Sequence, residues 1–74
     1  MKKYFKQYKE AGAKPEEVTK EEARRTLERW WQDEALNDIF ENDRGFRLYT
    51  PFSEVWTMDD DGTVPEAGYY GIVG

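Results

Sequence analysis

The chain has 74 residues, a formal net charge of −5, and neither cysteine nor histidine. These values exclude a disulfide framework and a zinc site with cysteine or histidine ligands, and a chain of this length forms one small domain. Three Trp, five Tyr and four Phe must supply much of the core, and they favour a folded chain although 36% of its residues are charged. We therefore expect a single domain over residues 1–74.

Residues 2–11 are expected to form a short amphipathic helix. Tyr4, Phe5 and Tyr8 share one side at helical spacing, lysines surround them, and Gly12 is placed to end the helix. A basic aromatic helix can also bind nucleic acid, but four lysines are few in an acidic chain, so we expect no direct nucleic-acid contact. The segment is too short and too polar for a secretory signal or a membrane anchor, and the lack of cysteine favours the cytoplasm.

Residues 19–40, which follow a connector at residues 13–17, predict the main helical region. Thr19 has the spacing of a capping box with Glu22, in which the threonine hydroxyl accepts the backbone N–H three residues on. The apolar residues that follow lie on two stripes that point in different directions. Two geometries fit: a break near residues 32–33, with Asp33 capping a second short helix, or one long drifting helix. A break is the favoured interpretation.

Two adjacent tryptophans, Trp30 and Trp31, lie in this region. They are about 100° apart on a helix, so they cannot both point into one thin core. Two interpretations stay open. Either both are buried, one inward and one under the sheet or the N-terminal helix, or one of them, Trp31 before Trp30, is partly exposed as an anchor for a partner.

After Gly45 the helical period gives way to alternation. Residues 46–50 and 54–58 each alternate between two faces and predict strands, and Tyr69–Val73 predicts a third strand. The segment Asp59–Gly62 is typical of a hairpin turn.

These elements predict an α+β fold. We expect two or three N-terminal helices, within residues 2–43, packed on a C-terminal three-stranded antiparallel β-meander, within residues 45–73. Helices on one face of the sheet would leave its other face free for a partner.

The sequence contains few residues that are suited to catalysis. Ser53 is the single serine and no histidine can act as its base. The Asp59–Asp61 cluster does not fit a calcium-binding loop of the EF-hand type, because Thr57 and Gly68 would occupy positions that require acids. We expect a protein that is not an enzyme and has no cofactor and no metal site.

Charge is distributed unevenly along the chain. Residues 1–31 carry nine Lys/Arg and six Asp/Glu, a net +3, whereas residues 32–74 carry two and ten, a net −8. The favoured hypothesis is a small acidic inhibitor that blocks a basic nucleic-acid-handling protein or complex by imitating phosphate charge. In size, acidity and lack of motifs the chain is similar, as a class, to phage and mobile-element proteins that inhibit CRISPR or restriction complexes.

The alternative hypothesis is a non-enzymatic adaptor or regulatory protein that binds a protein partner through exposed aromatics. A homodimer is a further possibility. The candidate partner-binding residues are the acids that the inhibitor hypothesis requires and the aromatics that the adaptor hypothesis requires: Trp31, Asp33, Glu34, Asp38, Glu41, Asp43, Tyr49, Glu54, Asp59, Asp60, Asp61, Tyr69 and Tyr70.

Overall fold

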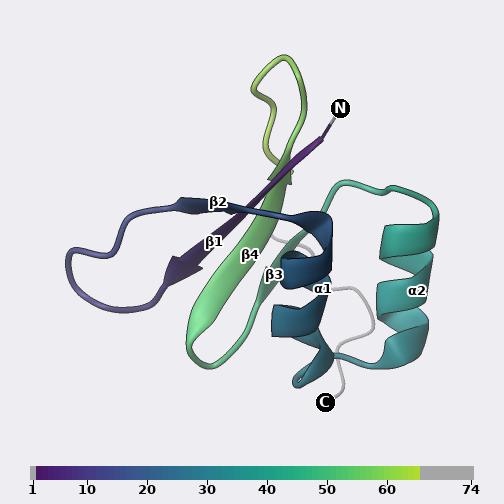
Figure 1. The fold of residues 1–74 in the computed structure, drawn as a ribbon, viewed down its shortest axis with the longest axis horizontal. Helices are drawn as coiled ribbons and strands as arrows, with labels where there is room; N and C mark the ends of the chain where they lie inside the picture. Colours follow the sequence, from purple (N-terminus) through teal and green to yellow (C-terminus); the bar gives the residue numbers. More distant parts are fainter. Residues whose placement is uncertain (1, 66–74) are drawn as a thin grey trace.

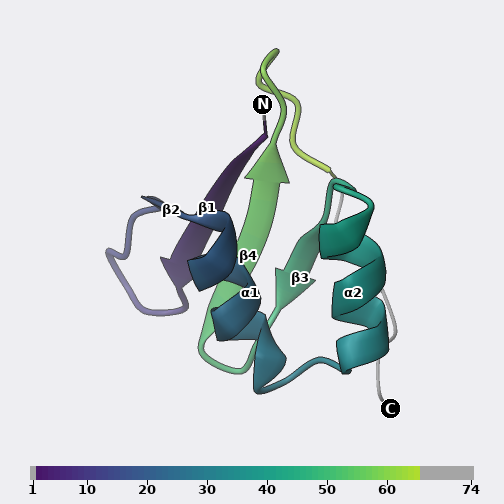
Figure 2. The same ribbon diagram turned by 45° about the vertical axis from the view of Figure 1, so that its right-hand side comes forward.

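The computed structural model describes residues 2–65 and shows an antiparallel sheet with helices on one face (Figure 1). Along the chain the elements are β1 (Lys3–Tyr8), β2 (Glu16–Val18), α1 (Lys20–Glu28), α2 (Asp33–Glu41), β3 (Arg47–Tyr49) and β4 (Ser53–Met58). The four strands follow the order β2-β1-β4-β3, so the N-terminal strand is central. Helix α1 lies over β1 and β4, and α2 lies beside it toward β3 (Figure 2).

The N-terminal segment corrects the expected fold class. Residues 2–11, predicted to be helical, contain the central strand β1, so the predicted order of helices followed by a three-stranded meander is wrong. The aromatics of this segment fit a helical period, but β1 pairs with β4 along its whole length. In the strand Tyr4 is buried against the helices, while Phe5 lies on the opposite face and stacks on Trp56. Pairing with a distant strand has overridden the local pattern.

The connector is corrected as well. Its last two residues, Glu16 and Glu17, form the edge strand β2 together with Val18, antiparallel to β1. The chain reverses between these strands at Gly12, whose φ of +82° glycine adopts without strain. Gly12 therefore belongs to a hairpin loop and does not end a helix.

The helical region is broken, as the favoured interpretation predicted. Thr19 is the N-cap of α1, and its hydroxyl accepts the backbone N–H of Glu22 at 3.1 Å. Helix α1 ends at Glu28, and α2 begins at Asp33. The N-cap of α2 is Gln32 rather than Asp33, which is the first residue of the helix.

The predictions for the two later strands are confirmed. Strands β3 and β4 pair in antiparallel register, and the Asp59–Gly62 segment that follows them is a turn, closed by a 2.8 Å hydrogen bond from Gly62 N to Asp59 O. The predicted strand Tyr69–Val73 lies outside the described residues.

The core lies between the helices and the sheet. It consists of nine buried side chains: Tyr4, Ala23, Leu27, Leu36, Ile39, Phe40, Phe46, Leu48 and Val55. The Phe40 ring lies 6.2 Å from that of Tyr4 and 5.3 Å from that of Phe46, so three aromatic residues join α2 to β1 and β3. Each fully buried large side chain contributes about 1.5–3 kcal/mol. Within residues 2–65, neither helix has the length and apolar content needed to cross a bilayer.

Candidate functional site

The turn between β3 and β4 holds Phe52 in solvent. Thr50 and Ser53 flank the turn and are buried, and their side chains share a 2.9 Å hydrogen bond. The Thr50 hydroxyl oxygen also accepts the backbone N–H groups of Phe52 at 3.2 Å and Ser53 at 2.9 Å. With both ends of the turn fixed, Pro51 and Phe52 occupy its tip, and Phe52 is 66% exposed.

The end of α1 places Trp30 against this turn. The backbone N–H groups of Trp30 and Trp31 both donate to the Leu27 carbonyl at 2.9 Å, so the chain still turns beyond the last helical residue. Trp30 then points outward and is 44% exposed, and its ring meets that of Phe52 edge to face at 5.7 Å. Two large apolar side chains from distant parts of the chain thus form one exposed contact.

Trp31 has a different environment from Trp30. It is partly buried, packs against the core, and donates its indole N–H to the Tyr49 carbonyl oxygen at 2.9 Å. The sequence hypothesis placed Trp31 ahead of Trp30 as the exposed tryptophan, whereas the structure gives Trp30 the larger exposure.

Four large hydrophobic side chains are exposed within residues 2–65, and all of them surround the β3–β4 turn. Tyr8 pairs with Ser53 across the sheet, and Tyr49 pairs with Glu54. We call this surface the aromatic end, and it consists of Tyr8, Trp30, Tyr49 and Phe52. Figure 1 shows the β3–β4 turn and the C-terminal end of α1 at the lower side of the ribbon.

Lysines accompany the tyrosines of the aromatic end. The Lys6 ammonium lies 4.9 Å from the centroid of the Tyr8 ring, and the Lys9 ammonium lies 5.2 Å from that of Tyr49. The Lys9 backbone N–H also donates to the Phe52 carbonyl at 2.9 Å, which ties the end of β1 to the turn. Both lysines are close enough for cation–π attraction.

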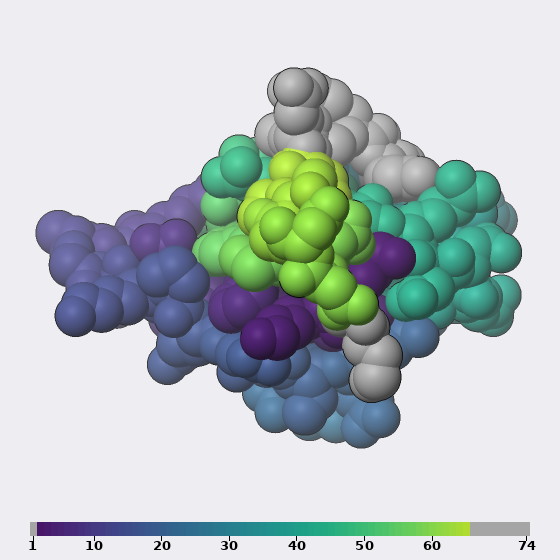
Figure 3. Space-filling view, turned by 90° about the horizontal axis from the view of Figure 1, so that it is seen from above, coloured from purple at the N-terminus to yellow at the C-terminus, as the bar shows by residue number. Residues whose placement is uncertain are grey.

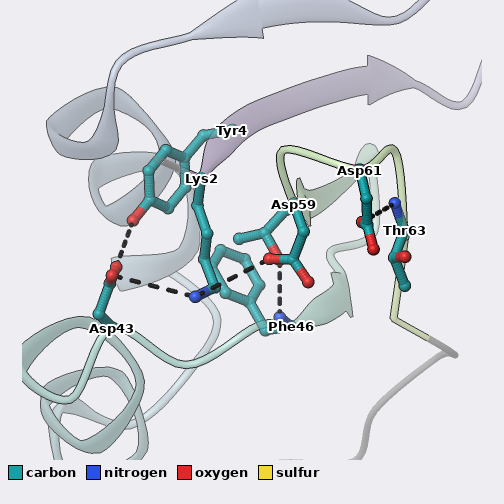
Figure 4. Close-up of polar contacts among 8 residues, drawn as sticks. Lys2, Tyr4, Asp43, Phe46, Asp59, Asp61 and Thr63 are labelled. Carbon is teal, nitrogen blue, oxygen red and sulfur yellow. Dashed lines mark hydrogen bonds and ion pairs between the residues drawn. The ribbon is translucent and has the colours of Figure 1, made fainter.

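A second surface, the acidic end, consists of Asp43, Asp59, Asp60 and Asp61. These residues come from the loops after α2 and β4 and line a recess of about 430 Å³ together with Lys2. Figure 3, seen from above, shows the yellow-green loop after β4 beside the purple N-terminal residues. Lys2 lies 3.9 Å from a carboxylate oxygen of Asp43 and of Asp59, so it compensates part of the negative charge (Figure 4).

Two hydrogen bonds fix carboxylates of the acidic end. The Tyr4 hydroxyl donates to Asp43 at 3.3 Å, and burial together with the Asp43 charge raises the pKa of Tyr4 to about 12. The Thr63 backbone N–H donates to Asp61 at 2.9 Å, and hydrogen bonding from Thr63 lowers the pKa of the Asp61 carboxyl. Both contacts are visible in Figure 4.

The other predicted acids do not join the acidic end. Asp33 and Glu34 lie in the first turn of α2, which is the opposite end of that helix from Asp43. Glu41 is exposed in the last turn, and Asp38 pairs with Arg44 at 3.3 Å. The remaining candidates are accounted for as follows: Glu54 pairs with Arg47 at 3.0 Å, and Tyr69 and Tyr70 lie outside the described residues.

Sequence reasoning missed Tyr8 and Phe52 as exposed residues of the aromatic end and ranked Trp30 behind Trp31. A signal for Phe52 was present, because a large hydrophobic residue directly after Pro51 and between two strands must sit in a turn. The exposure of Trp30 depends on where α1 ends, which the sequence pattern does not fix to one residue. The exposure of Tyr8 depends on its being at the end of a strand.

No protein-family model, curated protein or solved structure matches this chain. Within residues 2–65, no group of three or more acidic side chains is arranged to hold a metal ion. The single serine, Ser53, is buried and its hydroxyl is engaged with Thr50.

Proposed function

We propose that the protein is a non-enzymatic binding protein that contacts a protein partner through its aromatic end. The edge-to-face pair of Trp30 and Phe52 carries this proposal, because both rings remain substantially exposed although they touch. Burial of apolar surface stabilises a protein or a complex by about 25 cal/mol per square ångström, and surface left in water does not contribute this free energy. Clustered exposed aromatics mark interaction surfaces, and tryptophan and tyrosine are enriched among the residues that dominate binding energy.

The aromatic end is also held rigid before any partner arrives. The Thr50 hydrogen bonds fix the turn that carries Phe52, and the Trp31–Tyr49 bond fixes the segment that carries Trp30. A surface ordered in advance loses less conformational entropy on binding, so more of its contact energy becomes affinity. This supports an adaptor or regulatory role.

A capture experiment with paired variants tests the proposal. The tagged protein is incubated with a bacterial lysate at low and at high salt, beside the double variant Trp30→Ser/Phe52→Ser and the triple variant Asp59→Lys/Asp60→Lys/Asp61→Lys. We expect a partner that the triple variant and the unchanged protein both retain at high salt and the double variant loses. Equal capture by the double variant would refute the aromatic contact.

The acidic end supports a second candidate function. Four exposed aspartates converge there from two loops, as inhibition by phosphate imitation requires. The proposal is an inhibitor of a basic nucleic-acid-handling complex, of the anti-CRISPR or anti-restriction kind. If the protein is such an inhibitor, the same experiment should show a partner whose capture falls as the salt concentration rises and which the triple variant does not capture. Capture that changes neither with salt nor with the triple variant would refute the inhibitor function.

A further inference from the structure

We infer that the aromatic end binds an acidic polypeptide segment, with an apolar side chain on Trp30 and Phe52 and flanking carboxylates on the neighbouring cations. The inference rests on the proposed function, since it names the chemistry of the partner for the same surface. It comes from the charges around the four exposed aromatics.

Cations that form no ion pair with a carboxylate among residues 2–65 lie beside the aromatic end. Lys6 and Lys9 lie over the rings of Tyr8 and Tyr49, and Lys6 also lines a recess of about 310 Å³ with Arg25, Thr26 and Glu22. Within the described part of the chain, no carboxylate lies within 4.0 Å of the side-chain nitrogens of Lys6, Lys9 or Arg25. By contrast, Arg24 pairs with Glu28, and Arg47, which interacts with Tyr49, pairs with Glu54.

The carboxylates close to Lys6, Lys9 and Arg25 neutralise the positive charge of these three side chains only in part. The charge of Lys9 helps to lower the pKa of the Glu54 carboxyl, but that carboxylate already makes two hydrogen bonds to Arg47, at 3.0 and 3.2 Å. Glu22 shares the recess with Lys6 and Arg25, so one acid faces two cations there. A partner that carries carboxylates can therefore form ion pairs without displacing existing ones.

A polypeptide fits this surface better than single-stranded nucleic acid does. Nucleic-acid binding of that kind needs open aromatic faces on which bases stack. Here ammonium groups occupy a face of Tyr8 and of Tyr49, and the Trp30 and Phe52 rings meet at an interplanar angle of 64° instead of forming a flat platform. The net charge of −5 also repels a long polyanion, whereas a short segment with two or three acids experiences mainly the local cations.

Selection from a random peptide library tests the inference. A library of twelve-residue peptides displayed on yeast is selected on the immobilised protein, after depletion on the Trp30→Ser/Phe52→Ser variant. We expect the enriched peptides to contain a Leu, Phe or Trp flanked by Asp or Glu. Synthetic copies are then measured by fluorescence anisotropy against the unchanged protein and against Lys6→Glu/Lys9→Glu.

The charge-reversed variant has a matched control. Lys14→Glu/Lys20→Glu makes the same change in net charge at two exposed lysines that do not contact the exposed aromatics. We expect Lys6→Glu/Lys9→Glu to weaken binding of the acidic peptides at least tenfold and the control to change it less than threefold. Circular dichroism spectra of all variants confirm that they are folded.

The possible outcomes separate the inference from the proposed function. Enriched peptides that need Trp30 and Phe52 but lack acids, or that bind both charge variants equally, overturn the inference and leave the proposed function standing. No enrichment over the depleted variant overturns both. Binding of a fifteen-residue oligothymidylate that is lost with Lys6→Glu/Lys9→Glu overturns the inference in favour of nucleic acid. Self-association that Trp30→Ser/Phe52→Ser abolishes, measured by sedimentation velocity, overturns it in favour of a second copy of this chain.

Discussion

The indole N–H of Trp31 donates a 2.9 Å hydrogen bond to the backbone carbonyl of Tyr49, across the gap between the helix connection and the edge strand β3. The backbones of Phe46 and Thr50 form hydrogen bonds with β4. By alternation, the Tyr49 carbonyl therefore points away from β4, toward the side of β3 that has no neighbouring strand among residues 2–65. Trp31 thus covers part of an edge that would otherwise be available for pairing. Of the two adjacent tryptophans, Trp31 packs against the core and bonds to the sheet, whereas Trp30 is 44% exposed.

This difference between the two tryptophans predicts unequal effects on stability for two conservative substitutions. Trp31→Phe removes the hydrogen bond to Tyr49 and part of the packing, and we expect it to lower the free energy of unfolding by about 1–2 kcal/mol. Trp30→Phe should change it by less than about 0.5 kcal/mol, because an exposed side chain contributes little. Urea unfolding followed by far-UV circular dichroism measures both values. Equal destabilisation by the two variants would contradict the assignment.

The Thr50 hydroxyl should be important both for stability and for the aromatic end. Thr50→Val keeps the shape of the side chain but leaves the Ser53 hydroxyl without its hydrogen-bond partner and two backbone N–H groups without their acceptor. We expect a loss of about 1–3 kcal/mol in the free energy of unfolding. Thr50→Ser retains the hydroxyl and is the matched control, with a smaller loss. A Thr50→Val protein as stable as the control would show that the turn does not depend on this group.

The sequence allowed the middle of the fold to be predicted, because strong local signals agree with the tertiary structure there. The Thr19 cap, the break before Asp33 and the alternation in β4 all depend on residues close together in the chain. The N-terminal segment failed for the opposite reason. Its aromatics fit a helical period, and its strand conformation depends on pairing with β4, about fifty residues away in the chain.

The candidate site could be predicted only in part, because exposure is a tertiary property. The Asp59–Asp61 cluster could be predicted to be exposed, because its residue types are typical of a surface turn. Tyr49 could be identified from the alternation along its strand. The contact between Trp30 and Phe52 joins a helix end to a strand turn. No periodicity reports such a contact, because neither residue belongs to the regular part of an element.

The pair of Arg47 and Glu54 predicts a dependence on acidic pH. Partial burial tends to raise the pKa of the Glu54 carboxyl, but hydrogen bonds from Arg47 and Tyr49 outweigh burial and hold the pKa below its ordinary range. Because the folded-state pKa is depressed, this pair stabilises the protein fully above the unfolded-state pKa. That stabilisation is lost as the pH falls through the folded-state pKa.

Replacing Arg47 tests whether its ion pair with Glu54 lowers the pKa of the Glu54 carboxyl. Arg47→Met retains the aliphatic stem and removes the guanidinium, so we expect the Glu54 pKa to rise, since burial then acts with less opposition. Carbon-detected NMR titration of the Glu54 side chain measures the shift, and Arg44→Met, which leaves the Arg47–Glu54 pair in place, is the control. An unchanged Glu54 pKa in Arg47→Met would show that the ion pair is not its cause.

Tyr4 predicts a dependence on alkaline pH. Burial, the charge of Asp43 and the hydrogen bond to it raise the pKa of Tyr4 from 10.0 to about 12. The raised pKa means that the folded protein holds this proton after the unfolded chain has released it. The stabilisation is therefore complete below pH 10 and is lost as the pH rises toward 12.

The variant Tyr4→Phe keeps the ring packed against Phe40 and Phe46 and removes the titrating group. At pH 8 it should be less stable than the unchanged protein by about 0.5–1.5 kcal/mol, because it lacks the hydrogen bond to Asp43. Between pH 10 and 11.5 this difference should shrink and then change sign, since only the unchanged protein loses stability through this tyrosine. Urea unfolding of both proteins at each pH measures the difference, in which contributions from other titrating groups cancel. A difference that stays constant from pH 8 to 11.5 would show that Tyr4 titrates normally and that neither its burial nor the Asp43 carboxylate perturbs its ionisation.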